Sequence, residues 1–292
     1  MNKKYKCFVL FYSLRNVGGA EKNFLKLAEE IDSNNLEIKM MLGGELNEIY
    51  KITSIPTYSM SEEPNLRKPL SMLRFILRVR EILTKSPFHD FEFISFGPIY
   101  SFIAVVTKLT FSARYKIRVT VSERNSISLK KESWLVKIAR WIYFRQADLI
   151  TTNSKKNYYL ISNKGHQGCK LVRNYFEYGP LAAKQQCIGV MKLVIVSRLE
   201  PQKRVSEILQ KLSEASIHTA IKVDVFGAGS EYERVKVVSQ KINNIENRNI
   251  NIELNGFVPH DLIPLSEYDF SLHFSDYEGA SNSMIESLLN GI

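Results

Sequence analysis

The stretch "KLVIVSRLEPQKR" (residues 192–204) decides the fold, because it restarts a pattern that the preceding residues interrupt. It opens with an unbroken apolar run, which is typical of a strand buried on both faces of a parallel sheet. Residues 175–190, just before it, contain no convincing helix or strand and indicate a linker. A second α/β domain is therefore predicted to begin near residue 191.

The first half of the chain alternates short apolar runs with amphipathic segments. We expect strands at residues 5–12, 36–42, 91–96, 116–123, 148–154 and 169–174. Between them we expect helices near residues 20–31, 70–83, 100–110 and 132–144. Doubly apolar strands that are each followed by an amphipathic helix predict a parallel sheet covered on both sides.

The same alternation continues to the end of the chain. We expect strands at residues 192–199, 221–229, 251–257 and 270–276, and helices near 203–215, 230–243, 261–267 and from Ser283 onward. The predicted fold class is α/β, with two Rossmann-like domains that face a cleft. The predicted boundaries are an N-terminal domain at 1–176, a linker at 177–190 and a C-terminal domain at 191–292.

The composition is that of a globular protein with excess positive charge. The 292 residues carry a net charge of +10 and have a pI near 9.3, which favours an anionic partner such as a nucleotide-type substrate or an acidic membrane face. Scattered cysteines and the lack of an apolar run long enough to span a bilayer favour a cytoplasmic protein. We expect no nucleic-acid partner, because no basic stripe with interleaved aromatic residues follows a known module.

Two cations follow the first strand of the second domain. Arg198 stands where that strand ends, and Lys203 lies beyond a proline turn. In open parallel sheets ligands bind beyond the carboxyl ends of the strands, so both side chains can point at a diphosphate there. Two cations in a loop are also common as plain solvated side chains, and the spacing alone leaves both readings open.

Three turns at strand ends are candidates for backbone contact with a ligand. Gly18 and Gly19 open the first helix, and Gly227 lies in the Gly-Ala-Gly turn of the second domain. Glycine has no Cβ, so a phosphate or sugar can approach its backbone beside a helix start. Val258 follows an Asn-Gly turn whose backbone groups could meet a planar base. Each turn is equally well explained as a tight connection between a strand and a helix.

The stretch "DYEGASNSMIE" (residues 276–286) places two glutamates around small and turn-forming residues. Ser283 and Glu286 fit a capping box, in which the hydroxyl caps a helix start and the carboxylate reaches back. On that interpretation Glu278 is a solvated loop carboxylate. A functional interpretation, in which both carboxylates meet a ligand at the helix start, competes with it.

Several motifs are missing from the sequence. There is no Asp-x-Asp pair, no Gly-x-x-x-x-Gly-Lys-[Ser/Thr] loop, no metal-spaced His/Cys set and no Gly-x-Ser-x-Gly elbow. We therefore expect no metal cofactor, so cationic side chains and helix amides would meet the charge of any leaving phosphate. The adjacent glycines of the first turn also differ from the spaced dinucleotide fingerprint, which disfavours a nicotinamide dehydrogenase.

Taken in order, these motifs resemble those of one family. Gly-Gly-Ala-Glu after the first strand, Ser-Arg-Leu-x-x-x-Lys after the linker, then Gly-x-Gly, Asn-Gly-Phe-Val and Glu-x7-Glu are similar to the motifs of retaining GT-B glycosyltransferases of the family 4 type. The similarity is greatest to the bacterial branch that builds capsule, lipopolysaccharide or lipid-linked oligosaccharides from UDP-sugars. It covers nearly the whole chain.

The resemblance implies transfer of a hexose or N-acetylhexosamine from a UDP-sugar to a glycan or lipid-linked acceptor, with retention of configuration. Glu278 would lie against the donor sugar, and Glu286 would contact the ribose. Arg198 and Lys203 would hold the diphosphate and stabilise it as it leaves. The other donor-binding residues that the resemblance implies are Gly18, Gly19, Gly227, Val258, Gly279, Ser281, Asn282 and Ser283.

Two features depart from the family pattern. Many relatives carry a histidine at the end of the strand that here reads "VTVSERN", where this chain has Ser122 or Glu123. Glu123, Arg124 and Asn125 are therefore candidates for contacting the acceptor or a donor phosphate. Relatives also continue beyond "LLNGI", so we expect the second domain to be incomplete at its C-terminus. The alternative function is a catalytically impaired fragment that binds a nucleotide sugar or a partner chain.

Two basic amphipathic segments indicate an anionic membrane surface as a further partner. Residues 67–85 and 130–145 place Arg and Lys among leucine, isoleucine, phenylalanine and tryptophan. The same pattern fits helices that pack on a sheet and carry charge on their outer faces. Because the resemblance includes enzymes with polyprenyl-linked acceptors, we expect a peripheral location on the inner face of the cell membrane.

Overall fold

The chain forms two compact units, Met1–Tyr175 (unit 1) and Phe176–Ile292 (unit 2). The computed structural model describes residues 6–14, 19–34, 36–44, 55–60, 66, 68–124, 127, 133–164, 166, 168–176, 189–215, 218–246, 249–276 and 281–292. Within those residues, none of the helices is both long and apolar enough to cross a membrane.

Unit 1 is built on one sheet in which every strand pair is parallel. Its strands are β1 (Lys6–Tyr12), β2 (Glu37–Leu42), β3 (Thr57–Ser59), β4 (Asp90–Phe96), β5 (Lys116–Glu123), β6 (Leu149–Thr152) and β7 (Cys169–Leu171). Their order is β3-β2-β1-β4-β5-β6-β7. The chain therefore reverses its direction of travel across the sheet between β1 and β4, and ligands of such sheets bind at this point.

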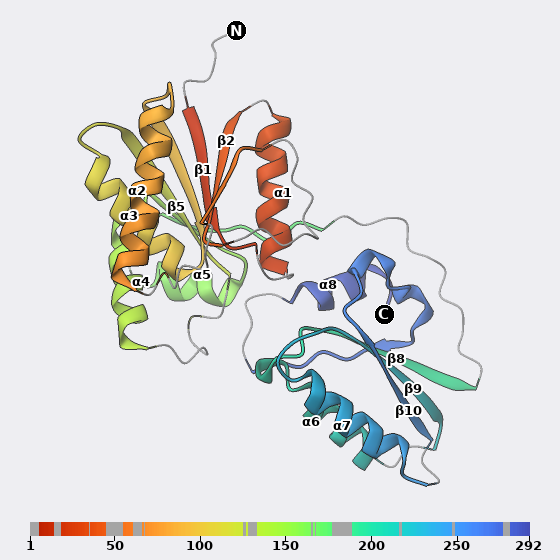
Figure 1. The fold of residues 1–292 in the computed structure, drawn as a ribbon. Helices are drawn as coiled ribbons and strands as arrows, with labels where there is room; N and C mark the ends of the chain where they lie inside the picture. Colours follow the sequence, from red (N-terminus) through yellow and green to blue (C-terminus); the bar gives the residue numbers. More distant parts are fainter. Residues whose placement is uncertain are drawn as a thin grey trace. The chain divides into compact units, whose positions relative to one another are not determined.

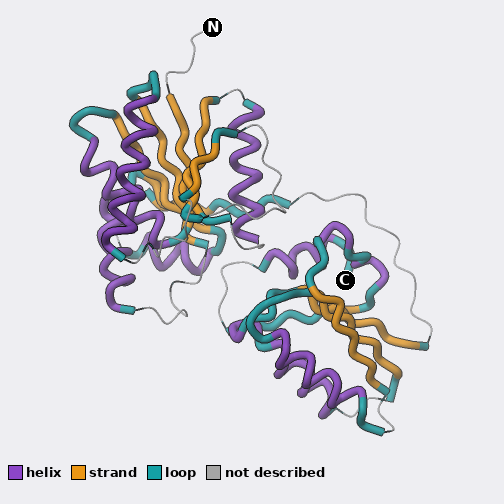
Figure 2. Tube along the Cα trace, viewed as in Figure 1, coloured by secondary structure: helices purple, strands orange, loops and turns teal. Residues whose placement is uncertain are grey.

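Helices cover both faces of this sheet (Figures 1 and 2). They are α1 (Gly19–Ser33), α2 (Pro69–Lys85), α3 (Pro98–Phe111), α4 (Trp134–Gln146) and α5 (Lys155–Ser162). Side chains of α2, α3 and α4 pack on one face in a single apolar cluster, and those of α1 pack on the other face in a second cluster. Two separate cores result, as expected for a parallel sheet buried on both sides.

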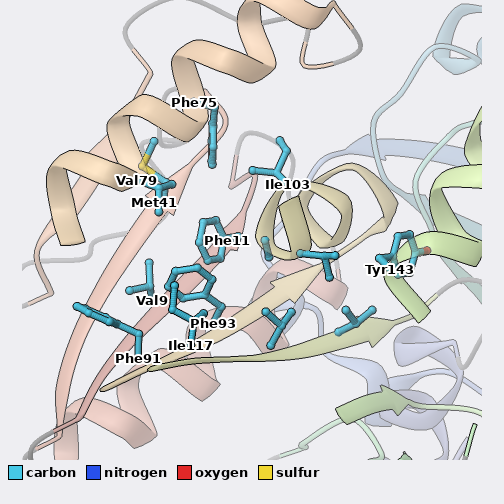
Figure 3. Packing of buried hydrophobic residues seen from close by; sticks show 14 of the residues in the cluster. Val9, Phe11, Met41, Phe75, Val79, Phe91, Phe93, Ile103, Ile117 and Tyr143 are labelled. Atoms are coloured by element: carbon cyan, nitrogen blue, oxygen red, sulfur yellow. The ribbon is translucent and has the colours of Figure 1, made fainter. Parts of the chain in front are cut away.

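Consecutive residues of β1 show how one strand supplies both cores. Val9 and Phe11 point into the larger cluster, whereas Leu10 belongs to the cluster under α1. Figure 3 shows the larger cluster, in which the ring centroid of Phe11 lies 5.0 Å from that of Phe93 and 6.2 Å from that of Phe75. Each fully buried phenylalanine contributes about 1.5–3 kcal/mol through the hydrophobic effect, so this face is the main source of stability for unit 1.

Unit 2 repeats the architecture on a smaller scale. Its strands are β8 (Val190–Val196), β9 (Ala220–Phe226), β10 (Ile250–Gly256) and β11 (Phe270–Ser271), all parallel and ordered β10-β9-β8-β11. The helices are α6 (Val205–Glu214), α7 (Tyr232–Asn243) and α8 (Asn282–Leu289), with single 3-10 turns η1 (Pro201–Lys203), η2 (His260–Leu262) and η3 (Leu265–Glu267). Leu193 and Ile195 of β8 pack in the core with α6 and α7, and Val194 packs on the opposite face.

The α/β class and its alternation of elements are confirmed, and the differences have local causes. The expected helix at 261–267 is two separate turns, because Pro264 stands between η2 and η3. The expected strand at 270–276 pairs with β8 only through Phe270 and Ser271. The sequence analysis missed β3 and α5, which are short and only weakly patterned. Most of the predicted linker, 177–188, lies outside the described residues.

Glu123, one of the candidate ligand-binding residues, is buried in unit 1 and held by α4. Its carboxylate accepts a hydrogen bond from the Tyr143 hydroxyl at 2.8 Å and lies 3.5 Å from Nη2 of Arg140. Arg140 also donates through Nε to the Tyr143 oxygen at 3.2 Å. Burial, and after it the charge of Glu123, raises the pKa of Tyr143 well above its usual value. These contacts tie the end of β5 to α4 and give Glu123 a structural role.

We predict that Arg140→Met destabilises the protein strongly, because it removes the cation that lies 3.5 Å from the buried Glu123 carboxylate. The expected loss in the free energy of unfolding is about 3–5 kcal/mol, measured by urea denaturation. Arg145→Met, which removes a charge from the exposed face of the same helix, is the control and should change stability little. Equal losses for the two variants would contradict the assignment.

Candidate functional site

One candidate site of unit 2 lies where the strand order of its sheet reverses. β8 and β11 are neighbours in the sheet, whereas β9 and β10 extend away on the other side of β8. A cavity of about 260 Å³ opens there, lined by residues that follow β8, residues that follow β11 and the start of α8. Its lining residues are Ile195, Ser197, Lys203, Val205, Ile208, Leu272, His273, Phe274, Ser275, Ser281, Ser283 and Met284.

The loop after β8 is held in place by the turn after β9. The backbone N–H of Ser197 donates to the Phe226 carbonyl at 3.0 Å, and that of Leu199 donates to the Ala228 carbonyl at 2.9 Å. Gly227 makes this packing possible, because a Cβ there would lie 1.8 Å from the carbonyl oxygen of Ser197. The close approach of the two backbones requires a glycine at position 227, whether or not a ligand binds there. It also fixes the position of the loop that carries the predicted cations.

Lys203 is the predicted residue with the most unusual environment. It ends the η1 turn, where its N–H donates to the Glu200 carbonyl at 2.8 Å, and its side chain lines the cavity. Burial, and after it the positive charge of Arg198, lowers the pKa of Lys203 to about 8. The two cations are therefore close enough to repel each other, and a bound anion would relieve both effects.

Hydroxyl groups and one imidazole form the opposite side of the cavity. Nε2 of His273 lies 2.6 Å from the Ser271 hydroxyl, and Nδ1 lies 3.4 Å from the Ser283 hydroxyl. The Ser283 hydroxyl in turn lies 3.2 Å from that of Ser281. Burial, and after it the charge of Lys203, lowers the pKa of His273, so the neutral imidazole is favoured. The wall is polar and neutral, and all of its groups can donate hydrogen bonds.

The helix start at residues 281–286 differs from the expected capping box. Ser281 is the N-cap of α8, and its carbonyl accepts the first helical bond from Ile285 at 3.2 Å, so the assignment of Ser283 as the cap was wrong. The Ser283 hydroxyl is engaged with the cavity wall instead. Oε2 of Glu286 lies 3.0 Å from Nε2 of His260, a ring nitrogen that has no aligned hydrogen-bond partner among the described residues. The Glu286 carboxylate thus lies beside a neighbouring turn.

Of the other predicted donor residues of unit 2, those that the structure describes do not line the cavity. Arg198 is exposed on the loop after β8, and Asn282 is the first residue of α8. Val258 follows β10 and packs against the apolar cluster of Val194 and Tyr268. Glu278 and Gly279 lie outside the described residues. The structure therefore brings together Lys203, Ser281 and Ser283, with Arg198 acting on Lys203 through its charge.

The remaining candidates belong to unit 1. Gly19 is the first residue of α1, and Arg124 follows directly after β5. Gly18 and Asn125 lie outside the described residues. Within the part of the chain that the structure describes, no group of three or more His, Cys, Asp or Glu residues could hold a metal ion.

Solved structures of other proteins share this architecture over almost the entire chain. The lipopolysaccharide outer core galactosyltransferase WaaB matches with a TM-score of 0.71 and 16% identity, over 98% of this chain and 79% of that one. HepE of Anabaena, solved with UDP and glucose, matches with a TM-score of 0.75 and 16% identity, over 97% and 78%. S. aureus TarM, solved with UDP, matches with a TM-score of 0.64 and 12% identity, over 98% and 84%. The fold is that of the GT-B glycosyltransferases.

Sequence comparison adds nothing to this result. No protein-family model matches the chain, and no curated protein sequence matches it. The GT-B fold is thus recognised from structure at sequence identities too low to carry over an activity.

Several residues of the site in this GT-B fold escaped the sequence analysis. His273 and Ser271 lay inside a segment interpreted as a strand, and His260 lay in an ordinary turn. Their only sequence signal was polarity at the end of an apolar run. The pairing of β11 with β8 brings His273 and Ser271 to the site, and the sequence does not show this pairing.

We predict that Gly227→Ala displaces the loop after β8 and destabilises unit 2, because its methyl group would overlap the Ser197 carbonyl. The expected loss is about 1–3 kcal/mol, measured as a lower melting temperature. Gly44→Ala is a matched control, since Gly44 has a similar backbone angle (φ +151° against +155°) and no described atom within 4 Å of the added carbon. A loss of the same size at Gly44 would contradict the packing argument.

Proposed function

We propose that this chain is a glycosyltransferase that moves a hexose or N-acetylhexosamine from a UDP-sugar to a glycan or lipid-linked acceptor. The observation that carries the proposal is the cavity of unit 2, where Lys203 lies half-buried beside Arg198 in a protein with the GT-B fold. Structures with this fold contain UDP in HepE and TarM and UDP-glucose in HepE. The diphosphate of a nucleotide would form charge-assisted hydrogen bonds with these two cations.

The donor would bind by its diphosphate at the cations and by its ribose at the start of α8. Lys203 and Arg198 meet the charge that grows on the diphosphate as the sugar departs, so no divalent metal is required. Backbone N–H groups at the start of α8 and the hydroxyls of Ser281 and Ser283 add donors on the other side. Glu286, placed by His260, would accept from the ribose hydroxyls.

We propose that transfer retains the anomeric configuration. The bond between the anomeric carbon and the diphosphate oxygen breaks, and the acceptor oxygen bonds to the same face of that carbon. The acceptor proton passes to the departing diphosphate, which balances the reaction. Glu278, by its likeness to the first glutamate of the Glu-x7-Glu motif, would lie against the donor sugar. Gly18 and Gly19 would let the diphosphate approach the backbone of unit 1.

A peripheral location on the inner face of the cell membrane is part of the proposal. Trp134 and Trp141 of α4 are 68% and 60% exposed, and Leu73 of α2 is 52% exposed. Exposed lysine and arginine residues lie among them, including Arg145, whose guanidinium stacks 4.9 Å from the Trp141 ring. Such helix faces suit an interface with anionic lipid, where a lipid-linked acceptor would be found.

We predict that the affinity for UDP-glucose falls as the pH rises above about 8, because Lys203 in the protein without ligand loses its proton there. A bound diphosphate favours the protonated amine and raises its pKa, so the affinity should drop by up to about tenfold per pH unit above that value. Calorimetric titration between about pH 7 and pH 9 measures the slope, and a UDP-sugar has no phosphate group that titrates in this range.

Lys203→Arg keeps its charge throughout and should make the affinity independent of pH over the same range. Lys211→Gln removes an exposed lysine from α6 and should leave the pH dependence unchanged. An unaltered pH slope in Lys203→Arg would exclude Lys203 from the donor site.

We predict that Glu278→Ala lowers turnover by about 10²–10³-fold and leaves UDP affinity almost unchanged, because Glu278 acts at the sugar. The measurement is UDP release from UDP-glucose, UDP-galactose and UDP-N-acetylglucosamine, with water as acceptor. Glu214→Ala, at an exposed position of α6, is the matched control. Unchanged UDP release by Glu278→Ala would remove this mechanism, and failure of UDP to raise the melting temperature of the intact chain would remove the proposed function.

A further inference from the structure

Arg124 is a half-buried cation at the carboxyl edge of the unit 1 sheet. It follows β5 directly, and its guanidinium carbon lies 5.1 Å from the ring centroid of Phe96, which ends β4. These two strands are neighbours on the side of the sheet that begins at the reversal between β1 and β4. Arg124 thus occupies the edge at which sheets of this kind bind ligands.

Among the residues that the structure describes, every hydrogen-bond partner of the Arg124 side chain is uncharged. Nε donates to the Ser122 hydroxyl at 2.8 Å, and Nη1 donates to the Val172 carbonyl at 3.2 Å and to Oδ1 of Asn174 at 3.0 Å. Nη2 has no partner among the described residues, and no carboxylate among them forms an ion pair with Arg124. The side chain is therefore fixed in direction, while no carboxylate in the described part of the chain neutralises its charge.

Arg124 differs from Arg140, the other arginine discussed in unit 1, in lacking a carboxylate partner among the described residues. Arg140 is also buried in unit 1, and there the Glu123 carboxylate compensates its charge. At Arg124, burial, opposed only in part by nearby Tyr12, lowers the pKa to about 10. Taking a cation out of water without a counter-charge is unfavourable, so such a site is stabilised by an anion from outside the chain.

Two further groups at the same edge lack hydrogen-bond donors. Oγ1 of Thr152, at the end of β6, and Oδ1 of Asn153, the next residue, are buried and have no partner among the described residues. The Asn153 amide donates at 3.3 Å to Oδ1 of Asn174, the oxygen that also accepts from Arg124. Buried acceptors without donors are rare in folded proteins, and hydroxyl groups of a ligand would satisfy them.

We propose that the edge formed by Arg124, Asn153 and Asn174 binds the acceptor through an oxyanion, with the hydroxyl groups of the acceptor directed at Asn153 and Thr152. The ligand class is an anionic sugar or polyol, which carries either a phosphate or a carboxylate. A guanidinium with a fixed plane and an open Nη2 is suited to either group. This inference rests on the proposed function and adds the charge of the acceptor to it.

The acceptor is favoured over the donor because the donor already has its own cations. Arg198 and Lys203 belong to unit 2, whereas Arg124, Asn153 and Asn174 all belong to unit 1. The described residues thus contain one cationic centre in each unit. We assign the centre of unit 2 to the donor and the centre of unit 1 to the acceptor.

The test uses the full chain carrying Arg198→Gln and Lys203→Gln, so that anion binding at the donor cations is removed. Calorimetric titration with glucose 6-phosphate and with glucuronate then reports the second centre, and glucose is the neutral control. We expect at least one anionic sugar to bind and glucose to bind at least about tenfold more weakly. The stronger of the two anions identifies the group as phosphate or carboxylate.

Adding Arg124→Gln should weaken that binding by at least about tenfold, whereas Arg118→Gln, on the same strand and more than half exposed, should not. If Arg124→Gln lowers the melting temperature, Arg124→Lys carries the test. It keeps the charge but loses the planar pair of N–H donors. Its affinity for the anionic sugar should lie between that of the protein with Arg124 and that of Arg124→Gln.

Two results would overturn the inference. One is binding of both anionic sugars that does not depend on Arg124, or no binding of either. The other is a tenfold or greater loss of UDP affinity in the single variant Arg124→Gln, which would assign the guanidinium to the donor. The proposed function fails separately, if the intact chain does not bind UDP at all.

Discussion

The closeness of two cations on one loop, Lys203 and Arg198, is the constraint on which the proposed donor binding by unit 2 depends. Burial, and after it the positive charge of Arg198, lowers the pKa of Lys203 to about 8. The loop that carries both is held to the turn after β9 by backbone hydrogen bonds and by the close approach of Gly227. A rigid backbone that keeps two cations together is preorganised for an anion, which is how charge stabilisation in an active site becomes effective.

Two arginines of unit 1 differ in whether a described carboxylate lies against them. Arg140 and Glu123 neutralise each other between β5 and α4, so this pair holds the structure together. Arg124, one residue after Glu123, makes hydrogen bonds only to neutral groups within the described residues. Successive residues at a strand end point to opposite faces, and that alternation places one side chain in the core and the other at the ligand-binding edge.

The pattern of elements could be predicted because it follows from local chemistry. Doubly apolar runs such as that of β8 can be buried only as central strands, and the amphipathic segments between them must cover the sheet. The failures also have physical reasons. Ser283 and Glu286 have the right spacing for a capping box, but His273 and His260 provide them with partners from other elements. Pro264 divides an expected helix, and the strand expected at 270–276 pairs with β8 only through Phe270 and Ser271.

The sequence by itself determined the two α/β units, the strand ends that carry polar groups and the presence of Arg198 and Lys203 on one loop, because each depends on neighbours along the chain. Only the tertiary structure decided that β11 lies beside β8, which brings His273 and Ser281 to the cavity of Lys203. It also decided that Arg140 lies against a carboxylate, whereas Arg124 has no such partner among the described residues. Pairing between distant strands is set by packing of the whole sheet, and burial shifts a pKa only after that packing exists.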